Sequence, residues 1–179
     1  MNLQDYKIVF AGNMGAGKTA AIQSISEIDV LCTEALNTDV DTHRKQLTTV
    51  GIDYGEITLD DDTTIGLYGT PGQERFSFLW DMISKSALGI IILINHTVED
   101  PIKKLETYLS NFGKLSQNIV IGITHIDKKS KKSPAIYRQW EDTQQPIYPL
   151  FFIDARIKED ILMLIEALLS NAEVNLESK

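Results

Sequence analysis

The chain has 179 residues, a net charge of −8, 43% hydrophobic residues and 23% charged residues. This length and composition fit one globular domain over residues 1–179 and exclude an intrinsically disordered chain. The negative charge argues against non-specific nucleic-acid binding, which needs a basic surface.

Short β-rich runs alternate with helical patterns along the chain, which predicts an α/β fold with a mostly parallel sheet. The first predicted strand covers residues 6–11, and a helix with regularly spaced apolar residues follows from Gly17. Residues 29–48 are polar and lack a clear period, so we expect a long loop there. Residues 51–59 and 63–68 flank three aspartates and predict an antiparallel hairpin.

The second half of the chain continues the alternation of strands and helices. Residues 74–86 predict a helix. The continuous apolar runs 87–95 and 118–124 are typical of strands that are buried on both faces of a sheet. Pro101 predicts the start of a helix between these two strands.

The C-terminal part predicts one more strand and one more helix. The strand covers residues 147–153, and we expect it at the edge of the sheet because Pro149 cannot donate a ladder hydrogen bond. The final helix has apolar residues on one face from Ile161 to Leu168.

The cysteine content and the terminal residues bear on the cellular compartment of the protein. Cys32 is the single cysteine, so no intrachain disulfide can form and we expect a reducing, cytoplasmic compartment. The N-terminal residues MNLQDYK have neither the basic region nor the apolar region of a signal peptide. Asn2 stands where myristoylation needs glycine, and the terminal NLESK holds no prenylation cysteine, so we expect no direct membrane anchor.

A phosphate-binding motif lies between the first predicted strand and the first predicted helix. Residues 12–19 read GNMGAGKT, a full match to G-x-x-x-x-G-K-[ST]. Its glycines let backbone N–H groups wrap a polyanion, and the helix N-terminus adds a positive dipole end. Lys18 supplies a charge to the β- and γ-phosphates, and the Thr19 hydroxyl is a ligand for Mg²⁺. The predicted phosphate-binding residues here are Gly12, Asn13, Met14, Gly15, Ala16, Gly17, Lys18, Thr19 and Ala20.

With this motif in place, nearly the whole chain resembles the Ras-like small GTPases. It is most similar to their bacterial branch, the relatives of the small GTPases that control cell polarity and motility. The similarity lies in TTVGIDYG (48–55), GTPGQE (69–74), THID (124–127) and DAR (154–156). The resemblance implies a six-stranded, mostly parallel sheet with one antiparallel edge strand and helices on both faces. It also implies a GTP/GDP switch that uses Mg²⁺ and hydrolyses GTP slowly.

The resemblance assigns roles in the two switch segments. Thr49 is implied as the threonine that reaches Mg²⁺ and the γ-phosphate, with Thr48 as the alternative. Gly72 would donate its N–H to the γ-phosphate, so that loss of this phosphate releases the loop. Gln73 falls on the position that orients the attacking water. Gln73 and Lys18 are therefore the expected catalytic residues.

The resemblance also assigns a guanine site. Asp127 carries the most information, because a carboxylate accepts two hydrogen bonds from guanine N1 and N2, where adenine offers neither donor. Thr124 replaces the family's asparagine and keeps one hydroxyl. His125 either stacks on the base or is an ordinary loop histidine. The remaining implied base-site residues are Asp154, Ala155 and Arg156.

Three residues depart from the family pattern. Gly69 removes the aspartate that holds a Mg²⁺-bound water, so we expect weaker Mg²⁺ dependence with nucleotide binding retained. Met14 replaces a glycine, and its bulk would crowd Gln73 and block an arginine supplied in trans, so we expect slow hydrolysis. Pro71 stiffens the second switch. The motility branch shares this proline, which implies an activating partner with the roadblock fold that inserts no arginine.

Two other functions compete with the switch. A pseudo-GTPase that holds nucleotide as a scaffold, without significant turnover, is favoured by Gly69 and Met14. A P-loop kinase is disfavoured because such kinases close an arginine-rich lid, and the four arginines here are scattered at positions 44, 75, 138 and 156. No sequence feature names the downstream effector.

Overall fold

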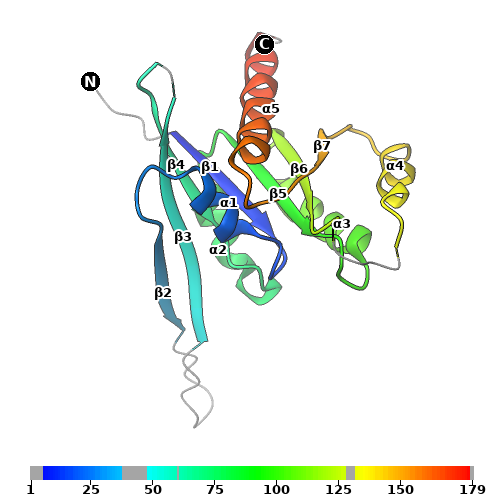
Figure 1. The fold of residues 1–179 in the computed structure, drawn as a ribbon, viewed down its shortest axis with the longest axis horizontal. Coiled ribbons are helices and arrows are strands. Elements are labelled where there is room, and N and C mark those ends of the chain that lie inside the picture. Colours follow the sequence, from blue (N-terminus) through cyan, green and yellow to red (C-terminus); the bar gives the residue numbers. More distant parts are fainter. Residues whose placement is uncertain (1–5, 38–47, 60, 128–131, 178–179) are drawn as a thin grey trace.

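The computed structural model describes residues 6–37, 48–59, 61–127 and 132–177. These residues form a seven-stranded sheet in the order β2-β3-β4-β1-β5-β6-β7, with five α-helices packed on it (Figure 1). The strands are β1 (Tyr6–Gly12), β2 (Leu31–Asn37), β3 (Thr48–Thr58), β4 (Thr64–Gly69), β5 (Gly89–Asn95), β6 (Ile119–Thr124) and β7 (Leu150–Phe152). The helices are α1 (Lys18–Ile25), the 3₁₀ turn η1 (Glu74–Phe76), α2 (Ser77–Ser84), α3 (Pro101–Phe112), α4 (Ala135–Glu141) and α5 (Lys158–Glu177).

The sheet is mostly parallel, as predicted. The neighbouring strands β4, β1, β5, β6 and β7 pair in parallel, whereas β3 pairs antiparallel with both β2 and β4. The α/β class and the hairpin around the three aspartates are therefore confirmed. Within the described residues, two details differ from the expectation: the sheet has seven strands rather than six, and the reversed strand β3 lies one position inside the edge.

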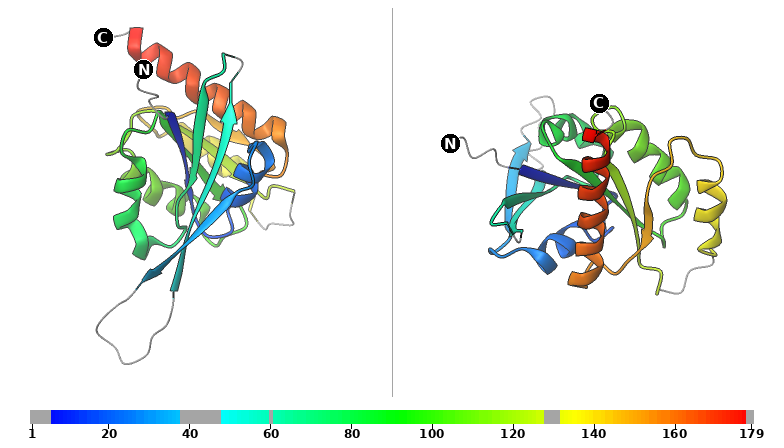
Figure 2. Two further views of the ribbon diagram at one scale, coloured as in Figure 1. Left: turned by 90° about the vertical axis from the view of Figure 1, so that its left-hand side faces the viewer. Right: turned by 90° about the horizontal axis from the view of Figure 1, so that it is seen from above.

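Strand β2 corrects the loop that was expected over residues 29–48. It pairs with β3 along its whole length, from Leu31 opposite Tyr54 to Asn37 opposite Thr48. Leu31 and Cys32 are exposed, and the sequence of residues 29–48 has no clear apolar period, so sequence periodicity did not reveal this backbone ladder. Figure 2 shows that β2 and β3 project together beyond the rest of the sheet.

Two apolar clusters cover the two faces of the sheet. Alternate residues of β5 point to opposite clusters: Ile91 and Leu93 pack with α1 and α5, and Ile90 and Ile92 pack with α2, α3 and α4. In Figure 1, α1 and α5 lie in front of the sheet and α3 lies behind it. Burial on both faces explains why β5 and β6 are continuous apolar runs, as the sequence predicted.

Two element boundaries confirm or refine the sequence prediction. Helix α3 begins at Pro101, and the Asp100 carboxylate caps it by accepting the Lys103 N–H at 3.0 Å. Strand β7 lies at the edge, as predicted, but starts after Pro149, whose carbonyl accepts the Ile121 N–H at 2.8 Å. Within the part of the chain that the structure describes, none of the helices has the length and apolarity needed to cross a membrane.

The carboxyl ends of the central strands meet at one edge of the sheet. The register places Gly12 beside Leu93, Phe10 beside Gly69, and Asn95 beside Thr124. Ligands of open parallel α/β sheets bind outside such an edge. The sequence motifs follow these strand ends, so the fold gathers them in one place.

Candidate functional site

The loop between β1 and α1 has a backbone that requires glycine. Gly12, Gly15 and Gly17 have φ values of 137°, 75° and 97°, which side chains rarely adopt. A Cβ at Gly12 would also lie 1.9 Å from the Leu93 carbonyl oxygen, because β1 and β5 are hydrogen-bonded there. The loop therefore keeps its glycines for shape, and it presents its backbone amides at the start of α1.

Lys18 is held inside this loop. Its side chain is 9% exposed, and Nζ donates to the carbonyl oxygens of Gly12 at 2.7 Å and of Asn13 at 3.0 Å. Burial lowers the pKa of Lys18 to about 8, and the charge of nearby Asp53 partly opposes this shift. A phosphate beside the ammonium would stabilise its charged form. The loop is thus suited to a polyanion.

Asn95, at the end of β5, supports the same loop and was not predicted as a site residue. Its backbone N–H donates to the Asn13 side-chain oxygen at 3.3 Å, and its side-chain amide donates to the Gly15 carbonyl at 3.3 Å. The role of Asn95 depends on the pairing of β1 with β5, which a sequence pattern does not specify.

A carboxylate that the sequence analysis missed lies against Thr19. The Thr19 hydroxyl donates to Asp53 Oδ2 at 2.5 Å, and Asp53 Oδ1 accepts from Cys32 Sγ at 3.0 Å. Asp53 is buried on β3, directly opposite Gly69 in the antiparallel register with β4. The site therefore has an acidic group beside Thr19 even though residue 69 is glycine.

Gly69 makes room for this carboxylate. A Cβ at Gly69 would lie 3.0 Å from Asp53 Oδ2 and 3.2 Å from Ile22 Cδ1, so these side chains would have to shift slightly to accept a larger residue. One signal was present in the sequence: positions 53, 55 and 57 form the buried phase of β3, and an aspartate in that phase is unusual.

Thr49 is described through its backbone alone. Its backbone lies in β3 opposite Leu36, and its side chain falls outside the described residues. Asp53 lies four positions further along the chain. This corresponds to about 13 Å along an extended strand. In this conformation the backbone of Thr49 is thus remote from Thr19, and its contact with Mg²⁺ stays a prediction, as does the alternative at Thr48.

The second switch packs directly on the phosphate loop. A Cβ at Gly72 would lie 2.6 Å from the Met14 amide nitrogen and 2.9 Å from Lys18 Nζ. Gln73 is exposed, and its Nε2 lies 3.9 Å from Met14 Sδ. The expected proximity of Met14 to Gln73 is present in the structure. A pocket of about 280 Å³ opens between Asn13, Met14, Gly72, Gln73, Glu74 and Lys104.

A second pocket collects the predicted base-site residues. It has a volume of about 250 Å³ and begins beside Gly17 of the phosphate loop. Its lining residues are Gly17, Ala20, Thr124, His125, Asp127, Asp154, Ala155 and Arg156. The six residues predicted for the base therefore meet in one pocket, next to the start of α1.

Thr124 acts at the floor of this pocket rather than inside it. The residue is 1% exposed, and its hydroxyl donates to the Ala16 carbonyl at 2.9 Å. The same oxygen lies 2.9 Å from His125 Nδ1, and His125 has a positive φ of 61°. Thr124 thereby connects the end of β6 to the phosphate loop and helps to orient His125.

Asp154 and Arg156 form a fixed pair at the rim of the pocket. Asp154 Oδ1 accepts from the Arg156 backbone N–H at 3.0 Å and from Nε at 2.8 Å, and Oδ2 accepts from Nη2 at 2.5 Å. These hydrogen bonds from Arg156 lower the pKa of Asp154 to about 2. Arg156 Nη2 also lies 4.0 Å from Asp127 Oδ2. The guanidinium therefore lies between two carboxylates, an arrangement that the sequence motif did not reveal.

Comparison with known proteins places this site in a protein family. A family model described as "conserved hypothetical ATP binding protein" matches residues 28–168. The chain belongs to this family. The match begins after the phosphate loop, so membership in the conserved hypothetical ATP binding protein family rests on the rest of the fold, the base-site residues included.

Curated proteins with similar sequences include Ras-related Rab proteins. Human Rab-30 is 24% identical over 169 residues, which are 89% of this chain and 76% of Rab-30. Human Rab-8B is 27% identical over 109 residues, which are 59% of this chain and 47% of Rab-8B. Human EF-hand calcium-binding domain-containing protein 4B is 28% identical over 109 residues, 59% of this chain but 13% of that protein. The match to these last two relatives covers less than half of their length.

The fold itself is shared with a solved GTPase domain. The G domain of the T. maritima FeoB iron transporter aligns with a TM-score of 0.64 and 17% identity, covering 94% of this chain and 99% of that chain. The P-loop GTPase fold predicted from the sequence is therefore confirmed. At this identity the likeness concerns the fold alone, and the base that this family member binds has to be argued from its own residues.

Proposed function

We propose that this chain binds GTP and GDP with Mg²⁺, hydrolyses GTP slowly and acts as a molecular switch through its second switch loop. The observation that carries this proposal is the base pocket beside Gly17, which holds Asp127 at its rim. The Asp127 side chain is 69% exposed, so its carboxylate is open to a ligand. Similarity to Rab proteins and to a G domain supports the same direction.

The description of the family names ATP, and the choice of base therefore needs its own argument. Asp127 offers two acceptor oxygens side by side. Guanine presents two donors at its N1 and N2 positions, whereas the corresponding edge of adenine presents an acceptor and a C–H group. Adenine would offer the carboxylate no donor from the base, at a cost in affinity. Asp127 therefore favours guanine.

The substitution Asp127→Asn tests the choice of base. An amide offers one acceptor and one donor, which matches the N1–H and the C2 carbonyl of xanthine. We expect the variant to lose GTP affinity by about tenfold or more and to gain XTP affinity, because a polar mismatch that the bound base shields from water costs about 1–3 kcal/mol. Calorimetry with GTP, XTP and ATP on both proteins measures this. Wild type that prefers ATP to GTP would contradict the proposal.

Thr19 and Asp53 fit a magnesium ion. A hydroxyl and a carboxylate within 2.5 Å of each other, next to a phosphate-binding loop, supply the oxygen ligands that Mg²⁺ prefers. Bound there, the ion would neutralise charge on the β- and γ-phosphates. Asp53 changes the expectation drawn from Gly69: the acidic function is present on another strand, so we propose that nucleotide binding keeps a strong Mg²⁺ dependence.

Lys18, Gly72 and Gln73 would each have a separate role at the γ-phosphate. Lys18 would place its ammonium against the phosphate oxygens, and the Gly72 N–H would donate to the γ-phosphate. Gln73 would orient the attacking water once its amide leaves Met14 Sδ. Because the Met14 side chain shares this space, we propose slow turnover. If Gln73 never leaves Met14, the chain is instead a nucleotide-holding scaffold, and that contact is the observation that favours this second candidate.

We also propose an activating partner with the roadblock fold, which would reposition the switches without inserting an arginine. The support is the proline at position 71 and the space that Met14 occupies near Gln73. Single-turnover hydrolysis with and without such a partner tests this. Acceleration by an arginine-bearing activator, abolished when that arginine is replaced, would contradict the proposal.

A further inference from the structure

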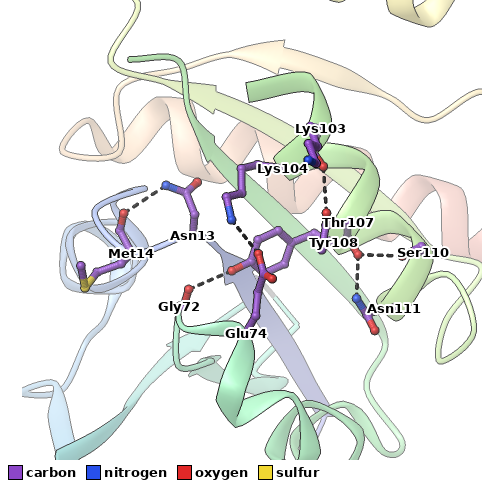
Figure 3. Close-up of polar contacts among 10 residues, drawn as sticks. All are labelled: Asn13, Met14, Gly72, Glu74, Lys103, Lys104, Thr107, Tyr108, Ser110 and Asn111. Carbon is purple, nitrogen blue, oxygen red and sulfur yellow. Dashed lines mark hydrogen bonds and ion pairs between the residues drawn. The ribbon is translucent and has the colours of Figure 1, made fainter. Parts of the chain in front are cut away.

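The second switch loop is tied to two helices by polar contacts, in addition to its packing on the phosphate loop. The Pro71 carbonyl accepts from Trp80 Nε1 at 3.0 Å, and the Gly72 carbonyl accepts from the Tyr108 hydroxyl at 3.0 Å. Lys104 Nζ forms an ion pair with Glu74 at 2.6 Å. Figure 3 shows Lys104 pointing from α3 toward Glu74, and Tyr108 pointing from the same helix toward Gly72.

Among these contacts, only the one from Tyr108 joins a buried side chain directly to the backbone of Gly72. The Tyr108 side chain is fully buried, and its ring packs on Trp80 and Phe112 at centroid distances of 5.1 and 6.2 Å. This packing fixes the hydroxyl without a further loss of side-chain entropy. Burial raises the pKa of Tyr108, so the hydroxyl stays protonated and donates. By contrast, Lys104 and Glu74 are about half exposed, and such surface pairs contribute little.

Gly72 lies close to the position at which we expect a γ-phosphate to bind. In phosphate loops of this kind the backbone amides cradle the α- and β-phosphates, while the lysine reaches the β- and γ-phosphates. A Cβ on Gly72 would lie 2.9 Å from Lys18 Nζ and 2.6 Å from the Met14 amide nitrogen. The backbone of Gly72 therefore lies against the ammonium group that the third phosphate would contact. We expect a diphosphate to leave this position to Gly72, and a triphosphate to displace Gly72 outward until its N–H faces the γ-phosphate.

We propose that Tyr108 is a positioning residue that holds Gly72 over the phosphate loop and thereby favours the diphosphate over the triphosphate. This inference rests on the proposed function, because it requires that both nucleotides bind. Movement of Gly72 away from Met14 breaks the hydrogen bond from Tyr108. The loss of this bond weakens the binding of the triphosphate. The diphosphate complex keeps the bond. A ligand shifts such an equilibrium only by its differential affinity for the two arrangements.

The substitution Tyr108→Phe tests this role, because it removes the hydroxyl and leaves the packed ring. One hydrogen bond contributes about 0.5–1.5 kcal/mol, so the affinity for a non-hydrolysable GTP analogue should rise about two- to tenfold relative to that for GDP. Isothermal calorimetry with both nucleotides gives the ratio. Tyr137→Phe is the matched control: Tyr137 is equally buried, and its hydroxyl contacts His96 instead of the switch. Its ratio should stay at the wild-type value.

A second measurement keeps the test independent of the nucleotide analogue. Amide hydrogen exchange at residues 72–76 in the GDP complex should be faster in Tyr108→Phe than in wild type, and unchanged in Tyr137→Phe. Equal affinity changes for both nucleotides, or unchanged exchange in the loop, would overturn the role of Tyr108. Lys104→Gln should shift the ratio less than Tyr108→Phe, and a larger shift would overturn the assignment of the main contact to Tyr108. Failure of wild type to bind either guanine nucleotide would instead refute the proposed function.

Discussion

The pocket proposed for the base, called the base pocket, and the Thr19–Asp53 side proposed for Mg²⁺, called the metal side, are assembled in different ways. Apart from Gly17 and Ala20, the base pocket is lined by two short segments, 124–127 and 154–156, at or just beyond the ends of β6 and β7. The metal side joins Thr19 of α1 to Asp53 of β3, and Asp53 faces Gly69 only through the register of β3 with β4. Contiguous sequence motifs therefore determine the positions of the base-pocket residues, whereas pairing between strands determines the positions of the residues on the metal side.

This difference explains how much of the site the sequence predicted. The six residues predicted for the base meet in one pocket because motifs at the ends of neighbouring parallel strands lie at the same edge of the sheet. Their binding of a base stays a prediction. Asp53 was missed because a motif search looks for the acid at position 69, and the sequence does not state which β3 residue lies opposite. Strand β2 was missed for a related reason, since its backbone pairing leaves no apolar period in the sequence.

The largest effect is expected on protein stability, at Gly12 at the end of β1, because both regions depend on the pairing of the central strands. Gly12→Ala places a Cβ 1.9 Å from the Leu93 carbonyl and in an unfavourable φ region, so β1 and β5 would have to separate. We expect a loss of about 3 kcal/mol or more in the free energy of unfolding. Gly51→Ala is the control, because no heavy atom lies within 4 Å of the added Cβ. Urea denaturation compares the two variants, and similar stabilities would contradict the assigned role of Gly12.

On the metal side, Asp53→Asn should weaken Mg²⁺ affinity in the nucleotide complex by about 10–100-fold, the range for groups that support a metal site. The measurement is a Mg²⁺ titration of GDP retention. The double variant Asp53→Gly with Gly69→Asp places the acid on β4 and should recover part of the affinity. An unchanged Mg²⁺ dependence in Asp53→Asn would show that the carboxylate has no part in metal binding.

In the phosphate loop, Met14→Gly should accelerate GTP hydrolysis by about tenfold. This is less than the roughly hundredfold loss of rate that a misplaced catalytic group causes. Removal of the side chain frees the Gln73 amide, which lies 3.9 Å from Met14 Sδ. Single-turnover rates measure the change. Met14→Leu keeps the bulk and should remain slow. Equal rates for wild type and Met14→Gly would exclude crowding as the cause of slow turnover.

The smallest effect is expected at the rim of the base pocket. Arg156→Ala removes the guanidinium between Asp154 and Asp127, so Asp127 loses a nearby orienting charge. We expect the preference for GTP over ITP, which lacks the 2-amino group, to fall by less than about fivefold, because exposed ion pairs contribute little. Arg138→Ala on α4 is the control. A preference that is unchanged in Arg156→Ala would show that Asp127 is oriented without Arg156.

The account as a whole is tested most directly by the nucleotide that the protein carries and converts. The protein is purified without added nucleotide, its bound nucleotide is identified by chromatography, and the complex with added GTP and Mg²⁺ is followed for hours. We predict bound guanine nucleotide and a slow conversion of GTP to GDP that requires Mg²⁺. Bound ATP or ADP, with no exchange for GTP, would contradict the assignment of Asp127 to guanine and with it the proposed switch.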